Sequence, residues 1–117
     1  MNRFGWVKPA LAAAVVVACA VPALADETGL AAIHAQQRER GNKTCFVDHY
    51  HYGSSSGRAT KKAAIASAIK SWADFTDFEY GSTWAHWGLA SSKTVTCSGG
   101  DGSWGCDINA RPCRKGR

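Results

Sequence analysis

Histidines are the side chains in this sequence whose type and spacing are best suited to chemistry. His49 and His51 are two residues apart in a segment with high β propensity. On a strand such a pair points to one side, with Cα atoms about 6.7 Å apart, so one metal ion could bridge the two rings. His86 or an acidic side chain would supply a third ligand. The pattern marks His49, His51 and His86 as a candidate Zn²⁺ or Cu²⁺ site, although a metal-free strand pair and no cofactor is the simpler expectation.

Other catalytic patterns have less support. The serines at 54–56 lie in a glycine-bounded run that lacks the Gly-x-Ser-x-Gly nucleophile motif. Asp74, Asp77 and Glu79 fit the solvated flank of a helix better than a positioned pair of catalytic carboxylates. An enzyme is therefore not the expected class, and a small secreted hydrolase is the lesser alternative.

The N-terminal residues 1–25 have the three parts of a secretory signal peptide: a positively charged start, an apolar run at 11–20 and a small-x-small cleavage site at 23–25. The run is shorter than the roughly 20 residues of a membrane-spanning helix, and no second one follows, so no transmembrane segment is expected. The expected location is periplasmic or secreted. A lipoprotein anchored through Cys19, in a loose lipoprotein box, is the minor alternative.

Four cysteines follow the signal peptide: Cys45, Cys97, Cys106 and Cys113. An even number in a small exported domain indicates two disulfides. A zinc site made of these thiols is not favoured, because no Cys-x-x-Cys pair is present.

The most specific structural signal is Asp101-Gly102, a preferred type I′ hairpin turn. With this turn as the loop, Cys97 faces Cys106 at a non-hydrogen-bonded position, where the Cα atoms are close enough for a disulfide. The register favours the pairing Cys97–Cys106, which leaves Cys45–Cys113. The competing set, Cys45–Cys97 with Cys106–Cys113, stays open.

Hydrophobic patterning supplies the remaining elements. It predicts a strand at 44–52, a flexible loop at 53–57, a long helix at 59–80 that ends at Gly81, and a second helix at 82–92. The predicted fold class is α+β, a small three-stranded antiparallel sheet in the order strand, long helix, short helix, β-hairpin, with helices on one face. The predicted core consists of Val47, Ile65, Ala68, Ile69, Trp72, Trp87, Val95, Trp104 and Ile108.

These elements divide the chain into four parts. They are the signal peptide (1–25), a flexible or short helical leader (26–43), a single disulfide-stapled domain (44–114) and a basic tail (115–117). The net charge of +5 falls to +3 without Arg3 and Lys8 of the signal peptide; it is mild and would suit an anionic envelope surface without demanding one. Nucleic acid is not an expected partner, because the export signal separates the protein from it and the basic residues serve as solubilising charge.

Aromatic residues are numerous for a chain of this size, and one helix stripe and one sheet face cannot bury them all. An exposed aromatic and basic surface is therefore expected, for contact with an unknown envelope component, a glycan or a protein. The candidate residues are Tyr50, Tyr52, Tyr80, Trp84, Arg111 and Arg114. The favoured function is an exported binding or structural module, and the alternative is a metal-binding protein centred on His49 and His51.

A Trp/Tyr-Gly helix region and a C-terminal Cys…Cys…Ala-x-Pro-Cys pattern extend over about residues 57–114. They are formed by Trp72, Tyr80-Gly81, Trp84, Trp87, Cys97, Trp104, Cys106 and Ala110-Arg111-Pro112-Cys113. In this spacing the chain resembles a group of uncharacterised short exported bacterial proteins. The resemblance implies a compartment and a layout, and it implies no catalytic residue.

Overall fold

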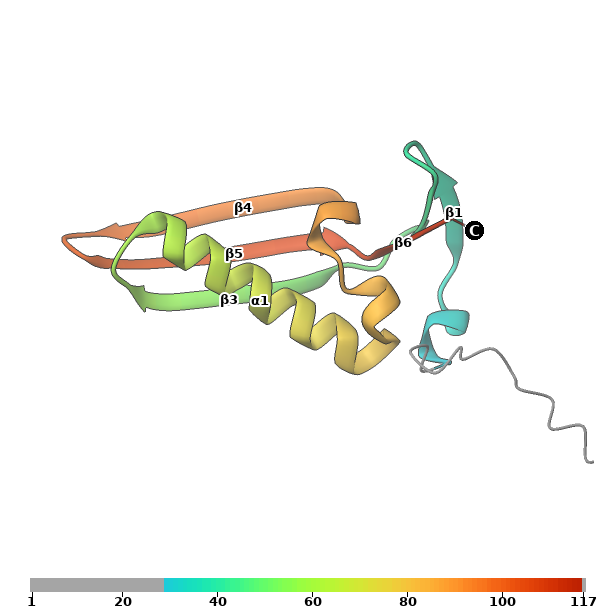
Figure 1. The fold of residues 1–117 in the computed structure, drawn as a ribbon, viewed down its shortest axis with the longest axis horizontal. Coiled ribbons are helices and arrows are strands. Elements are labelled where there is room, and N and C mark those ends of the chain that lie inside the picture. Colours follow the sequence, from blue (N-terminus) through green and yellow to red (C-terminus); the bar gives the residue numbers. More distant parts are fainter. Residues whose placement is uncertain (1–28, 117) are drawn as a thin grey trace, which may run out of the picture.

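The computed structural model describes residues 29–116, which form an α+β fold (Figure 1). The predicted signal peptide and Cys19 lie outside the described residues. The elements follow in the order η1 (Leu30–Ile33), β1 (Gln36–Glu39), β2 (Lys43–Phe46), β3 (His51–Arg58), α1 (Lys61–Tyr80), η2 (Ser82–Trp84), η3 (Trp87–Leu89), β4 (Ser91–Gly100), β5 (Ser103–Arg111) and β6 (Cys113–Lys115), where η denotes a short 3₁₀ turn.

The strands of residues 29–116 form two antiparallel sheets of three strands, not the single sheet predicted from the sequence. One has the strand order β3-β5-β4 and is covered on one face by α1, and the other has the order β1-β2-β6 and stands at one end of the first (Figure 1). Pro112 separates β5 from β6, because proline has no N–H for a ladder. The predicted strand 44–52 is divided in the same way: β2 ends at Phe46, and β3 begins in the other sheet at His51.

The β4–β5 hairpin has the register predicted from its turn. Cys97 faces Cys106, and both Asp101 and Gly102 have the positive φ, 50° and 77°, that a type I′ turn requires. The disulfides Cys97–Cys106 and Cys45–Cys113 are both present. The second joins β2 to β6, so it holds the smaller sheet together.

Helix α1 begins at a capping threonine and ends at a glycine. The Thr60 hydroxyl accepts a hydrogen bond from the Ala63 N–H, and Gly81 has a φ of 93°, in the region that favours glycine. The buried face consists of Ala64, Ala68, Trp72, Thr76 and Tyr80. Every fourth residue thus faces inward along the helix, and the last of them, Tyr80, is buried in the final turn.

The predicted core is only partly correct. Ala68, Trp72 and Ile108 are buried, whereas Val95 on β4 is 45 % exposed. The reason is that α1 packs mainly over β3 and β5, which leaves much of β4 open. The other predicted core residues are half-buried: Val47, Ile65, Ile69, Trp87 and Trp104.

The segment 53–57, predicted to be a flexible loop, belongs to strand β3. The first of its two glycines, Gly53, serves packing rather than flexibility. A Cβ atom added to Gly53 would lie 2.6 Å from the Trp72 backbone nitrogen, closer than real Cβ contacts allow. The missing side chain therefore lets β3 approach α1 closely.

The helix predicted at 82–92 is replaced by the turns η2 and η3 and the start of β4. Two tryptophans explain the difference, because they pack in different directions. Trp84 stacks on Phe46, with ring centroids 4.4 Å apart, whereas Trp87 stands edge-on to Trp72 at 5.3 Å. In addition, the backbone of Ala85 forms a parallel bridge with Cys113, which a helix would not permit.

The N-terminal segment contributes more structure than the predicted flexible or short helical leader. Its strand β1 pairs with β2. Ala31 in η1 is buried in a second core cluster together with Phe46, Tyr80 and Trp84. The folded unit therefore begins before residue 44. At the other end, the predicted basic tail starts inside β6, which extends to Lys115.

Candidate metal centre

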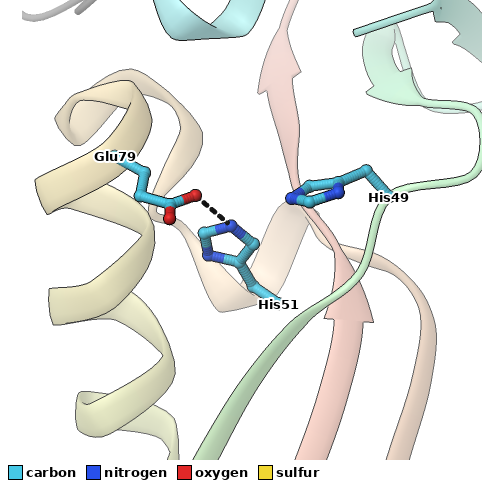
Figure 2. A group of neighbouring side chains, drawn as sticks. All are labelled: His49, His51 and Glu79. Carbon is cyan, nitrogen blue, oxygen red and sulfur yellow. Dashed lines mark hydrogen bonds and ion pairs between the residues drawn. The ribbon is translucent and has the colours of Figure 1, made fainter.

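Three side chains with metal-ligating groups meet where β3 begins and α1 ends: His49, His51 and Glu79 (Figure 2). Their ligand atoms all lie within 4.8 Å of one another. The topology explains the meeting, because α1 follows β3 after a tight connection and runs back along it. The last turn of the helix thus returns to the first residue of the strand.

His51 has a fixed orientation in the interior, where it is only 2 % exposed. Its Nδ1 lies 3.1 Å from the Thr76 hydroxyl, and that hydroxyl donates its proton to the Trp72 carbonyl at 2.7 Å. Because a hydroxyl has only one proton to donate, Thr76 must accept from His51. The Nδ1 atom therefore carries a proton, and in the neutral ring Nε2 has the lone pair.

The lone pair on Nε2 is directed at a carboxylate. His51 Nε2 lies 3.0 Å from Glu79 Oε2 (Figure 2). With neutral His51 and ionised Glu79, two lone pairs would face each other across this distance. Such a pair of atoms is suited to sharing a cation, either a proton or a metal ion.

The surroundings of the two histidines disfavour their protonation. Burial lowers the pKa of His51 below 6.5, and the neighbouring His49 adds to this, although the Glu79 carboxylate opposes it. Burial likewise lowers the pKa of His49, assisted by the nearby His34. Both rings therefore favour the neutral form at neutral pH, which is the form that binds metals.

Tyr80 and His34 hold the outer side of the cluster. The Tyr80 hydroxyl lies 2.6 Å from His49 Nε2 and 3.0 Å from His34 Nε2, and the rings of His34 and His49 stack with centroids 4.1 Å apart. Burial, with the Glu79 carboxylate nearby, raises the pKa of Tyr80, so the phenol stays protonated. Its hydroxyl is shared among His49, His34 and the Glu79 carboxylate, and the contact with His49 holds that ring in place.

The structure brings together only two of the three predicted metal ligands. His86 is not among the ligating group and instead lines a separate hollow. Glu79, which the sequence suggested was a solvated flank, takes its place. A signal for it existed, since Glu79 follows Trp72 and Thr76 at spacings of seven and three, which place all three on one helix face.

Three of the six predicted surface-binding residues are buried, which corrects the expectation for them. Tyr80 and Trp84 are each 1 % exposed and Arg111 is 9 % exposed. Tyr80 belongs to the histidine cluster, and Trp84 lies against Phe46. The other three keep some exposure: Tyr50 at 39 %, Tyr52 at 64 % and Arg114, which is half-buried.

Arg111 is buried because it joins the two sheets. Its guanidinium forms a two-point ion pair with Glu39, at 2.7 Å and 3.2 Å, and Nη1 also donates to the Phe46 carbonyl at 2.6 Å. The Ser91 hydroxyl donates to Glu39 as well. The bonds from Arg111, above all, hold the pKa of Glu39 at about 2. This network fixes the chain just before the histidine segment.

Comparison with protein-family models, with curated proteins and with solved structures finds no match to this chain. In the part of the chain that the structure describes, no helix is both long and apolar enough to cross a membrane. The two disulfides are typical of proteins that fold in an oxidising, non-cytoplasmic compartment.

Proposed function

We propose that this protein binds a divalent transition-metal ion, with Zn²⁺ as the best fit, through His49, His51 and Glu79. The observation that carries the proposal is the pair formed by His51 Nε2 and Glu79 Oε2, 3.0 Å apart, with the other nitrogen of His51 committed to Thr76. Two imidazoles and one carboxylate are a common zinc ligand set, and it leaves the fourth position open for water or a ligand.

The hydrogen bond from His51 to Thr76 supports this assignment. Histidines that bind metals usually donate their second ring N–H to a carbonyl, carboxylate or water, and this fixes which nitrogen faces the metal. Here the Thr76 hydroxyl and the Trp72 carbonyl form that support.

The geometry needs only a small adjustment to hold the ion. Bonds of about 2.0–2.2 Å in a tetrahedral site place ligand atoms about 3.5 Å apart. The pair His51–Glu79 is near this separation, and His49 would approach by roughly 1 Å from the present limit of 4.8 Å. His49 lies in the extended link before β3, outside any ladder, so this movement breaks no strand pairing. It does require the His49 ring to loosen its 2.6 Å contact with the Tyr80 hydroxyl.

The proposed place of action is the periplasm or the exterior of the cell. The signal peptide predicted at residues 1–25, the two disulfides and the resemblance to short exported bacterial proteins support it. The aromatic and basic binding surface stays a prediction for Tyr50, Tyr52 and Arg114 only. Of the two roles considered from the sequence, metal binding now has the more specific structural support.

Isothermal titration of the purified, metal-free protein with Zn²⁺ at pH 7 tests the proposal. We expect one site per chain with a dissociation constant of about 1 µM or lower, as is usual for preformed sites of this ligand class. His51→Ala and Glu79→Gln should each weaken binding by at least about tenfold, because each removes one of three ligands.

Two matched variants serve as controls. His86→Ala removes a histidine outside the cluster, and Asp77→Asn removes an exposed acidic group from the same helix turn. Both should bind Zn²⁺ as the unaltered protein does. Absence of binding heat, or equal binding in His51→Ala and His86→Ala, would refute the metal site and leave His51–Glu79 as a proton-sharing ion pair.

A further inference from the structure

The hollow that His86 lines lies apart from the group formed by His49, His51 and Glu79, between α1, the turns η2 and η3, and β6. Its volume is about 620 Å³, within the range of about 300–1,000 Å³ that is usual for small-molecule sites. Apolar side chains form most of its wall: Ile69, Ala73, Trp87 and Leu89.

The wall is held in place by contacts outside the hollow. Ile69 and Ala73 are four residues apart and so lie on one face of α1. Trp87 is anchored edge-on against the buried Trp72, and the Leu89 carbonyl accepts a hydrogen bond from Lys43 Nζ at 2.8 Å. The hollow is therefore formed before any ligand arrives, which reduces the entropy lost on binding.

The one charged side chain that lines the hollow is cationic. Lys115 and His86 line it, and no Asp or Glu is among the lining residues. Among the described residues, Lys115 forms no ion pair with a carboxylate. An apolar wall beside an uncompensated ammonium group is complementary to a molecule that has an apolar body and one anionic group.

We propose that this hollow binds an amphiphilic carboxylate, with its apolar chain against Ile69, Ala73 and Trp87 and its carboxylate at Lys115. The site does not depend on the metal centre, because the two share no residue. It adds a binding activity for a small anionic amphiphile to a protein proposed to bind metal.

Calorimetric titration with sodium decanoate tests this proposal, with decyltrimethylammonium as a probe of equal chain length and opposite charge. We expect decanoate to bind at one site with a dissociation constant of about 10–100 µM, the range that ligand efficiencies allow for a molecule of this size. The cation should bind at least about tenfold more weakly, because it meets Lys115 with like charge.

Two variants locate the binding. Lys115→Glu should weaken decanoate binding by about fivefold, the upper end of the effect of an exposed ion pair. Lys62→Glu, an exposed lysine outside the lining, should not weaken it. Ala73→Trp should fill the hollow and abolish binding, with an unchanged circular dichroism spectrum to show that the fold is kept. No decanoate binding, equal binding of both probes, or binding that Ala73→Trp and Lys115→Glu leave unchanged would overturn the proposal.

Discussion

Replacing Glu39 by glutamine should show how strongly the two sheets depend on one ion pair. Glu39 on β1 receives two hydrogen bonds from Arg111 at the end of β5, so the pair joins sheets that otherwise share few contacts. Glutamine keeps the shape and one acceptor oxygen but removes the charge. Arg111, a residue that is 9 % exposed, then loses the counter-charge of its guanidinium.

The magnitude follows from the acidity of Glu39. Its pKa falls from 4.5 to about 2, which at 1.36 kcal/mol per pH unit corresponds to roughly 3 kcal/mol. The Glu39 side chain is 20 % exposed, so solvent weakens its ion pair with Arg111. We therefore expect Glu39→Gln to lower the free energy of unfolding by about 2 kcal/mol at pH 7.

Because the pKa of Glu39 is lowered in the folded state, its contribution is complete above pH 4.5 and is lost as the pH falls from 4.5 toward 2. Urea unfolding at pH 7 and at pH 3 measures both effects. The difference between the unaltered protein and Glu39→Gln should be about 2 kcal/mol at pH 7 and clearly smaller at pH 3. A difference below about 0.5 kcal/mol at pH 7, the usual range of a neutral surface change, would refute the reasoning.

Three further predictions follow from the packing, the bridges and the histidines. Gly53→Ala should lower the unfolding free energy by about 1–3 kcal/mol, because the added methyl group meets the α1 backbone. Urea unfolding measures this loss. Gly57→Ala is the control for backbone strain, because Gly57 has a positive φ but open space around it, so a comparison of the two losses separates overpacking from strain. Loss of Cys45–Cys113, which spans 68 residues, should cost about 4 kcal/mol and loss of Cys97–Cys106, which spans 9, about 2.5 kcal/mol; equal losses in paired Cys→Ala variants would contradict this order. Zn²⁺ affinity should weaken as the pH falls, because protonation of the two ligating histidines competes with the metal. Burial lowers the pKa of both histidines, so the loss of affinity should have its midpoint below pH 6.5. Titrations from pH 5 to 8 that give a midpoint above pH 6.5 would count against this prediction.

Local rules accounted for the parts of the fold that sequence could predict. The turn at Asp101-Gly102 determines the hairpin register, and the register places Cys97 opposite Cys106. With that bridge made, only one partner remained for Cys45. The long helix followed from its stripe and its end at a glycine, since both are encoded within a few turns of chain.

Long-range packing decided the parts that sequence did not predict. The segment after α1 could have continued as a helix, but Trp84 and Trp87 belong to different clusters and separate it into two turns. The division of the sheet depends on the Pro112 break and on the pairing of β1 with β2, and the pattern of 26–43 was too polar to show that strand. Tertiary contacts override local propensity in these places.

The candidate site shows the same division. The rings of His49 and His51 lie together, with centroids 5.1 Å apart, but His49 precedes β3 rather than sharing the predicted strand with His51. The third ligating group, Glu79, comes from the last turn of a helix whose exposed flank carries Asp74 and Asp77. Only the return of α1 along β3 brings that carboxylate to His51, and this requires the three-dimensional structure.

X-ray absorption at the zinc edge of the protein loaded with one equivalent of Zn²⁺ tests the central claim most directly. We predict four light-atom ligands at about 2.0–2.1 Å, two of them with the multiple scattering of imidazole. In Glu79→Gln one oxygen ligand should be lost or lengthened, while His86→Ala should give the unaltered spectrum. The account would be contradicted by a hydrated ion that has six oxygen neighbours and no imidazole scattering. Scattering from two imidazoles that persists in a His49→Ala, His51→Ala double variant would contradict it as well.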